Sequence, residues 1–240
     1  MHHIIEDKEF KIVMKKRIVN IQRFILLSLL FSSCATAYVP NVVNTPLMNN
    51  KGEFQASLNT GISGFDPQVA YALTDNIGLM VNGSFANRTS DSSDDFHKHQ
   101  FVEFGGGYFT KVGSAGRFEV FGGFGAGNLQ AEYDNELWVS KARVNSTRFF
   151  LQPAIGATTS VFDGSFASRF VYVNLSQNSD NASAMFVEPV LTGKVGYKYV
   201  KFIVQTGFSF LLTSNDVAFN YQPFIFSVGV QLNLGKLFDE

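Results

Sequence analysis

Few residues of this chain are of types that do chemistry, and most of them gather in one polar stretch. His97 and His99 closely follow the aspartates within residues 91–95, and serines occupy part of residues 90–93. Carboxylates and imidazoles can coordinate a divalent metal ion, and a hydroxyl beside an imidazole base can act as a nucleophile. No third residue of this stretch would orient such a pair, and no turn motif fixes the ligands. We therefore expect no metal site, no catalytic site and no cofactor.

The N-terminal residues have the order of an export signal. A basic stretch over residues 14–17 precedes the apolar run Phe24–Phe31. This run is too short to remain in a membrane as a spanning helix, which is typical of a signal peptide. We expect residues 1–33 to be that signal, with Met14 as a second candidate for the true start.

The single cysteine, Cys34, stands where the signal would be processed. Phe31-Ser32-Ser33-Cys34 resembles a lipobox, in which the thiol is lipidated and the chain is cut before it. Ala35-Thr36-Ala37 is a competing cleavage site, with small residues at its first and third positions, and its use would remove the cysteine. We expect lipidation at Cys34 and an extended periplasmic leader over residues 34–51.

The remainder has the composition and periodicity of a β protein. Charged residues make up 16% of the chain, against about 25% in an average soluble domain. No apolar run of about 18 residues follows residue 34, which excludes a transmembrane helix there. From Glu53 onward apolar and polar residues alternate with a period of two, as in β-strands. We expect about ten strands, with eight as the alternative, in one barrel domain over residues 52–240. They lie near residues 54–62, 65–73, 77–85, 99–111, 117–130, 145–159, 166–176, 184–195, 200–210 and 221–234.

Apart from the first hairpin, at Ser63-Gly64, the connections between these strands alternate in length. Short turns are expected at Thr74–Asn76, Gly113–Gly116, Phe162–Gly164 and Gly196–Lys198. Longer polar connections are expected at Arg88–Lys98, Tyr133–Arg143, Gln177–Ser183 and Leu211–Asn220. A transmembrane barrel has short periplasmic turns and longer outer loops, whereas a soluble sandwich has no reason to alternate. The pattern predicts an all-β fold, a closed antiparallel barrel in the bacterial outer membrane.

One face of the expected strands is aromatic and the other is polar and charged. A charged side chain that faces lipid at mid-depth costs about 2–4 kcal/mol, so the charged face must line the lumen. Because both signs of charge occur, we expect an internal ion-pair network, with Glu103 paired to Arg148, Glu119 paired to Arg169, and Glu188 on the same face. A lumen of this size is filled by side chains, which makes an open channel less expected than a closed core.

Four dipeptides form a weak repeat, in which a polar residue precedes proline at the start of an alternating run. They are Asp66-Pro67, Gln152-Pro153, Glu188-Pro189 and Gln222-Pro223. Proline has no N–H to donate to a ladder, so we expect bulges or bends at these positions.

Several motifs resemble those of a known family. They are Tyr38-Val39-Pro40-Asn41, Thr45-Pro46-Leu47, Lys51-Gly52-Glu53, Ala70-Tyr71-Ala72-Leu73-Thr74-Asp75-Asn76-Ile77-Gly78 and Phe149-Phe150-Leu151-Gln152-Pro153. From Cys34 to its end the chain resembles small outer-membrane barrel proteins, often lipoproteins, of the Bacteroidota. The motifs are structural, so the resemblance implies a fold and a location and carries no catalytic residue over.

These observations predict a non-enzymatic outer-membrane barrel lipoprotein with a structural or surface-binding role. Its expected partners are outer-membrane lipid and envelope proteins that contact the outer loops. The chain has no basic footprint for nucleic acid. Two alternatives remain, a lipid-modifying enzyme that uses His97 and His99, and a narrow pore.

Overall fold

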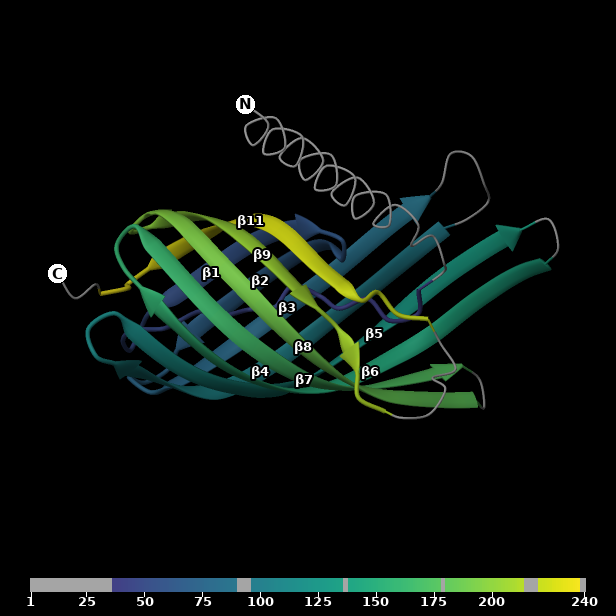
Figure 1. The fold of residues 1–240 in the computed structure, drawn as a ribbon, viewed down its shortest axis with the longest axis horizontal. Helices are drawn as coiled ribbons and strands as arrows, with labels where there is room; N and C mark the ends of the chain where they lie inside the picture. Colours follow the sequence, from purple (N-terminus) through teal and green to yellow (C-terminus); the bar gives the residue numbers. More distant parts are fainter. Residues whose placement is uncertain (1–35, 90–95, 136–137, 178–179, 214–219, 238–240) are drawn as a thin grey trace, which may run out of the picture. The chain divides into compact units, whose positions relative to one another are not determined.

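The computed structural model describes residues 36–89, 96–135, 138–177, 180–213 and 220–237, and these form a single sheet of strands (Figure 1). The strands are β1 (Phe54–Gly61), β2 (Gly64–Ala72), β3 (Ile77–Thr89), β4 (Phe96–Val112), β5 (Gly116–Asn135), β6 (Trp138–Thr158), β7 (Phe162–Gln177), β8 (Asp180–Tyr197), β9 (Val200–Phe208), β10 (Phe210–Leu211) and β11 (Phe224–Leu234). Among the described residues, no helix is long and apolar enough to span a membrane.

The sheet closes on itself as an antiparallel barrel. Strands β1 to β8 pair in sequence order, β8 pairs with β9, β9 with β11, and β11 with β1. The two-residue strand β10 adds to β8 beyond the end of β9. The predicted closed barrel of ten strands is therefore confirmed, with β10 as one extra strand. Closure gives each of the ten barrel strands a partner on both sides, so the barrel itself has no open edge.

Antiparallel pairing sends the two kinds of connection to opposite ends of the barrel. The turn end carries residues 73–76, 113–115, 159–161 and 198–199. At the opposite end, here called the loop end, lie residues 62–63 and 209–213, which include β10, and the paired strand ends Thr89 with Phe96, Asn135 with Trp138, and Gln177 with Asp180. Much of the sequence expected as long loops is strand, since β5 and β6 remain paired up to Asn135 and Trp138. The backbone of these polar segments bonds across the hairpin instead of to water.

The outer face of the barrel carries an apolar belt that stops short of the loop end. Along β6, Ile155, Leu151 and Phe149 point outward and are more than half exposed, and Thr147 and Asn145 follow them toward the loop end. Exposed belt residues on other strands are Leu79, Phe104, Phe124, Phe166, Phe170, Leu191, Phe202 and Val230.

The inner face of β7 changes polarity in the opposite sense. On β7 the buried, inward-facing residues Asp163, Ser165 and Arg169 are followed toward the loop end by Val171 and Val173. The inner face of β7 is therefore largely polar within the belt and apolar beyond it, while its outer face has the reverse order.

Three of the four prolines interrupt one ladder each. Pairing along β8 passes from Val190, opposite Gly207 of β9, to Val187, opposite Phe210 of β10, and Pro189 lies in this gap. Pairing of β2 with β3 passes from Phe65 directly to Gln68, and pairing of β6 with β7 passes from Leu151 to Ala154. The same number of residues is skipped on both partners, so Pro67 and Pro153 break hydrogen bonds without the extra residue that defines a bulge.

Residues 38–49 form an extended segment inside the barrel, here called the luminal segment. We expected residues 34–51 to lie outside the barrel as a periplasmic leader, but Tyr38, Leu47 and Met48 are completely buried. The segment runs through the interior as a purple thread and joins β1 at the turn end (Figure 1). It enters the lumen because it has no charged side chain, while the wall around it has polar groups that need partners.

Candidate functional site in the barrel lumen

The barrel wall binds the luminal segment chiefly through its main chain. Nine carbonyl oxygens between Tyr38 and Leu47 accept hydrogen bonds, eight of them from side chains of the wall. The side-chain donors are Arg148, Arg169, Gln68, Gln205, Gln152, Lys194, Gln55 and Lys236, and the ninth donor is the main-chain N–H of Gln222. Wall side chains thus replace the neighbouring strand that an extended backbone normally needs.

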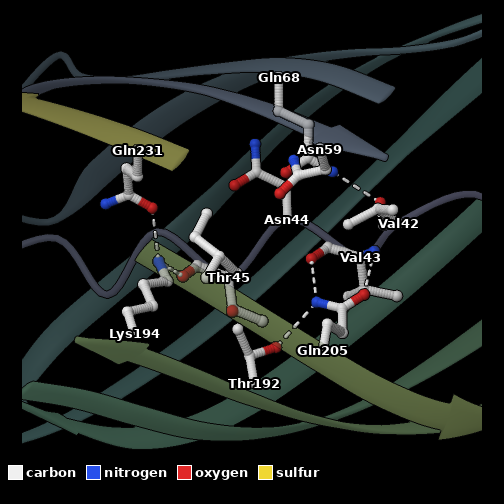
Figure 2. Close-up of a pocket in the computed structure, with 11 residues that line it drawn as sticks. Val42, Val43, Asn44, Thr45, Asn59, Gln68, Thr192, Lys194, Gln205 and Gln231 are labelled. Carbon is white, nitrogen blue, oxygen red and sulfur yellow. Dashed lines mark hydrogen bonds between the residues drawn. The ribbon is translucent and has the colours of Figure 1, made fainter. Parts of the chain in front are cut away.

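Gln205 of β9 is the centre of this arrangement (Figure 2). Its Nε2 donates to the carbonyl of Val43 and its Oε1 accepts from the N–H of Val43, both at 2.8 Å. Nε2 also donates to Oγ1 of Thr192 at 2.8 Å, which fixes the orientation of the amide. Nearby, Lys194 donates to the carbonyl of Thr45 and to Oε1 of Gln231, each at 2.8 Å. The pair of bonds at Val43 imitates the exchange between paired strands.

Replacing Gln205 tests whether these main-chain contacts stabilise the barrel. We expect Gln205→Leu to lower the free energy of unfolding by about 3 kcal/mol, because it removes the hydrogen-bond partner of the buried N–H and of the buried carbonyl of Val43. Urea unfolding of the refolded protein in detergent measures the change. Gln100→Leu, at an exposed position of β4, is the matched control and should change stability little. Equal stability of the two variants would contradict a role for Gln205 in holding the segment.

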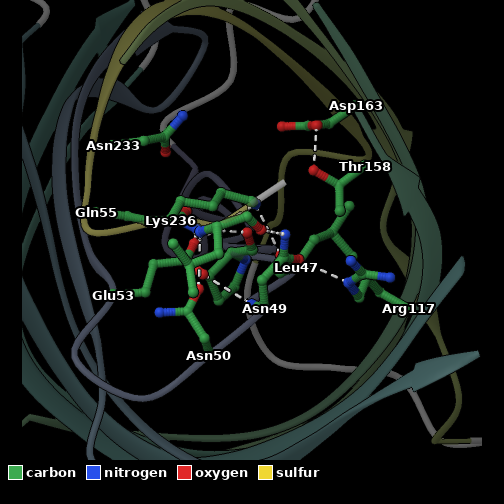
Figure 3. A network of polar contacts seen from close by, with 12 residues as sticks. Leu47, Asn49, Asn50, Glu53, Gln55, Arg117, Thr158, Asp163, Asn233 and Lys236 are labelled. Carbon is green, nitrogen blue, oxygen red and sulfur yellow. Dashed lines mark hydrogen bonds and ion pairs between the residues drawn. The ribbon is translucent and has the colours of Figure 1, made fainter. Parts of the chain in front are cut away.

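At the turn end a polar network fixes the last residues of the segment (Figure 3). The N–H of Leu47 donates to Oε2 of Glu119 at 2.9 Å, and Nζ of Lys236 donates to the carbonyl of Leu47 at 2.8 Å. The N–H of Asn49 donates to Oε2 of Glu53 at 2.7 Å, and Lys236 also pairs with Glu53 at 3.5 Å. The chain is thereby held on both sides just before it turns into β1.

The side chains of Leu47 and Met48 fill positions where the wall has glycine. A Cβ on Gly156 would lie 2.9 Å from the methyl groups of Leu47, and one on Gly78 would lie 2.8 Å from the sulfur of Met48. Leu47 has a φ of 50°, a left-handed conformation that is uncommon for leucine. Shape and hydrogen bonding together set the register of the segment in the lumen.

Arg169 is the centre of an ion cluster near the middle of the barrel. It pairs with Glu188 at 2.7 Å and with Glu103 at 3.7 Å, and all three side chains are almost fully buried. Arg169 and Glu188 are direct partners in the β7–β8 ladder. Glu188 also accepts the hydroxyl of Tyr38, and Glu103 accepts the amide of Asn41 at 2.7 Å. The luminal segment therefore completes the cluster.

The structure brings the predicted luminal residues into contacts other than the expected pairs. Glu119 accepts the N–H of Leu47 instead of pairing with Arg169. Arg148 donates to the carbonyl of Val39, and its guanidinium lies 4.7 Å from the ring centre of Tyr38. In both cases the observed partner belongs to the luminal segment.

The buried charges of the described residues balance within the lumen. The basic members are Arg117, Arg148, Arg169, Lys194, Lys201 and Lys236, and the acidic members are Glu53, Asp66, Glu103, Glu119, Asp163 and Glu188. A low-dielectric interior tolerates charges that are paired and hydrogen-bonded. Because the luminal segment adds no charge, it can occupy this interior without disturbing the balance.

The histidines considered for catalysis lie at the loop end of the lumen and contact a serine. Oγ of Ser84 lies 3.0 Å from Nε2 of His99, and Nδ1 of His99 lies 2.9 Å from Nε2 of His97. Ser84 is 2% exposed, and the cavity that His99 lines is no larger than about one water molecule. The pair meets the distance requirement for an activated hydroxyl, but the site has no room for an acyl chain.

Other predicted residues lie outside the part of the chain that the structure describes. Cys34 and the residues 90–95 belong to these gaps. Among the described residues there is no group of three or more side chains suited to hold a metal ion.

The sequence interpretation missed the residues that hold the luminal segment, although a signal for them was present. The repeated dipeptides that end in proline each supply a contact. Asp66 accepts the N–H of Val42 at 3.5 Å, and Gln152 donates to the carbonyl of Asn44 at 2.7 Å. Glu188 binds Tyr38 through its side chain, and Gln222 binds it through its N–H. In three of the four dipeptides the side chain of the polar residue makes the contact.

Comparison with known proteins adds no relative. No protein-family model and no curated protein matches the chain.

Proposed function

We propose that this protein is an outer-membrane β-barrel, lipidated at Cys34, with a structural or surface-binding role in the bacterial envelope. The observation that carries the proposal is the inverted polarity of the barrel. Its outward side chains are apolar across the belt, while charged groups of both signs are buried inside. A soluble barrel would expose its charges and bury its aromatic residues, whereas a barrel in lipid does the reverse.

Two further features support this location. Tyr108, Tyr197 and Tyr199 are exposed near the turn end, where the aromatic girdle of a membrane barrel would meet the lipid headgroups. The sequence motifs that resemble Bacteroidota barrel lipoproteins agree with it. The occupied lumen favours a structural or binding role over the alternative of a narrow pore.

The proposal is tested by isolating the protein from fractionated cells and measuring the mass of its mature N-terminus. Recovery from the outer membrane with a lipidated Cys34 supports both parts of the proposal. Recovery there with a free Tyr38 at the N-terminus removes the anchor and keeps the barrel. Recovery only from soluble fractions overturns the proposal.

A substitution at one outward position of the apolar belt, Leu151, tests whether lipid surrounds the belt. We expect Leu151→Arg to lower the stability of the barrel in phospholipid vesicles by about 2–4 kcal/mol, because the charge would face hydrocarbon. Asn145→Arg is the matched control, since Asn145 lies on the same strand and face but beyond the belt. Urea unfolding in vesicles measures both. A similar small effect of the two substitutions would argue against a membrane around the belt.

A lipid-modifying enzyme is the second candidate, and the contact of Ser84 with His99 is the observation that favours it. We expect Ser84→Ala and His99→Gln to leave the phospholipid and lipid A profiles of whole cells unchanged, because Ser84 is buried and faces the lumen. Mass spectrometry of extracted lipids checks this. A changed profile in both variants, at normal levels of folded barrel, would establish the enzyme instead.

A further inference from the structure

The luminal segment reaches from one end of the barrel to the other. At the turn end, Nδ2 of Asn50 donates to the carbonyl of Gly235 at 2.8 Å, and the N–H of Lys51 donates to Asp75 at 2.9 Å. At the loop end, the N–H groups of Ala37 and Tyr38 donate to the carbonyl of Asn220. The chain therefore enters the lumen at the end opposite to the one at which β1 begins.

The extended luminal segment is long enough to cross the hydrocarbon core of a membrane. From Ala37 to Asn49 an extended chain spans up to about 40 Å, and the hydrocarbon core of a bilayer is about 30 Å thick. The ring of Tyr38 stacks on Phe186 of β8 at 4.5 Å between ring centres. On that strand the exposed Met185 is the last apolar outward residue, and the exposed Ser183 follows it. Tyr38 thus lies at the edge of the apolar belt on the loop side.

Several contacts fix the position of Tyr38 at this edge of the apolar belt. Its hydroxyl binds Glu188, its carbonyl accepts the N–H of Gln222 at 2.9 Å, and Phe186 also packs against Tyr221 at 5.1 Å. Tyr38 and Tyr221 form a parallel β-bridge. These contacts direct the chain toward the loop end, and the wall binds the following main chain as far as Leu47.

We propose that the chain crosses the outer membrane inside its own barrel, so that the mature residues before Tyr38 are presented on the cell surface. This inference rests on the proposed function, because it takes the loop end as the outer face. The residues from Cys34 to Ala37 span at most about 10 Å. A lipid on Cys34 would therefore enter the outer leaflet of the membrane and not the periplasmic leaflet.

The test asks which positions of the full-length protein are accessible on intact cells. The same short protease site is inserted between Thr36 and Ala37, after Thr213 at the loop end, or between Gly113 and Ser114 at the turn end. Each variant is first shown to migrate as a folded barrel in unheated gels. We expect protease added to intact cells to cut the first two variants, and to cut the third only after the outer membrane is permeabilised.

The outcomes separate this inference from the proposed function. If the Thr213 site is cut on intact cells and the site before Ala37 is not, the inference is overturned and the outer-membrane barrel stands. If only the Gly113 site is cut, the orientation is reversed, so the inference is overturned and the outer-membrane barrel stands. If no site is cut until the cells are opened, the inference is overturned, and the fractionation of cells described above decides the outer-membrane barrel separately.

A point substitution covers the case in which an insertion prevents folding. Thr36→Cys, in a chain that keeps Cys34 because its lipidated thiol does not react, is treated on intact cells with a maleimide that does not cross membranes. Ser114→Cys in the same background is the matched control at the turn end. We expect at least a tenfold higher labelling of the Thr36 variant, and equal labelling of both only after permeabilisation. Labelling of the Thr36 variant that also requires permeabilisation would overturn the inference.

Discussion

Arg169→Met is expected to lower the free energy of unfolding of the barrel by about 3–5 kcal/mol, because it leaves buried carboxylates without their cation. Glu188 and Glu103 both pair with Arg169, and neither side chain is more than 1% exposed. The substitution also removes the donor to the carbonyl of Asn41 and so loosens the luminal segment. Urea unfolding of the refolded protein in vesicles measures the loss.

Two controls separate the buried charge from other effects of this substitution. Lys111→Met removes a cation from an exposed position of β4 and should cost less than about 1 kcal/mol. Adding Glu188→Gln to Arg169→Met should recover part of the loss, since one unpaired carboxylate is then neutral. If the double variant is no more stable than Arg169→Met alone, the cluster is not held by charge pairing.

Leu47→Asp is expected to displace the turn-end half of the luminal segment. The new carboxylate would be buried close to Glu119, which already accepts the N–H of Leu47 at 2.9 Å. Lys236, the cation that contacts the carbonyl of Leu47, already pairs with Glu53, so the added charge should cost at least about 3 kcal/mol. Withdrawal of the segment leaves a gap that water can fill, so planar bilayers should show conductance that the unmodified protein lacks.

Leu47→Met is the matched control, because it keeps an apolar side chain of similar volume and should cost less than about 1.5 kcal/mol. It should also leave the bilayer without conductance. Conductance of the unmodified protein at the level of the Leu47→Asp variant would show that the segment does not close the lumen, and would favour the pore.

The barrel could be predicted from the sequence because the period of two reports directly which side chains share a face. The partners of Arg169 could not, because they depend on the register between strands and on what lies in the lumen. Glu188 is directly opposite Arg169 in the ladder, whereas Glu103 reaches it from β4. Depth along a strand alone does not distinguish these partners from Arg148 or Glu119.

The luminal segment could not be predicted because a chain surrounded on all sides has no amphipathic pattern. Residues such as Asn41, Asn44 and Pro46 have the composition of an exposed leader, and here they bind wall groups. The continuation of the strands into the long polar connections could not be predicted for a related reason. Beyond the apolar belt, the outward residues of β6 become polar while the strand continues, so polarity alone suggested loops.

The course of the luminal segment has a consequence for assembly. The segment precedes β1, and the barrel closes where β1 meets β11, the last strand of the chain. The segment must therefore already be in place when this seam forms, because a bulky or acylated end could not be pulled through a closed, filled ring afterwards. In the folded molecule the barrel is closed around its own luminal segment, and withdrawing the whole segment with such an end requires opening the pairing of β1 with β11.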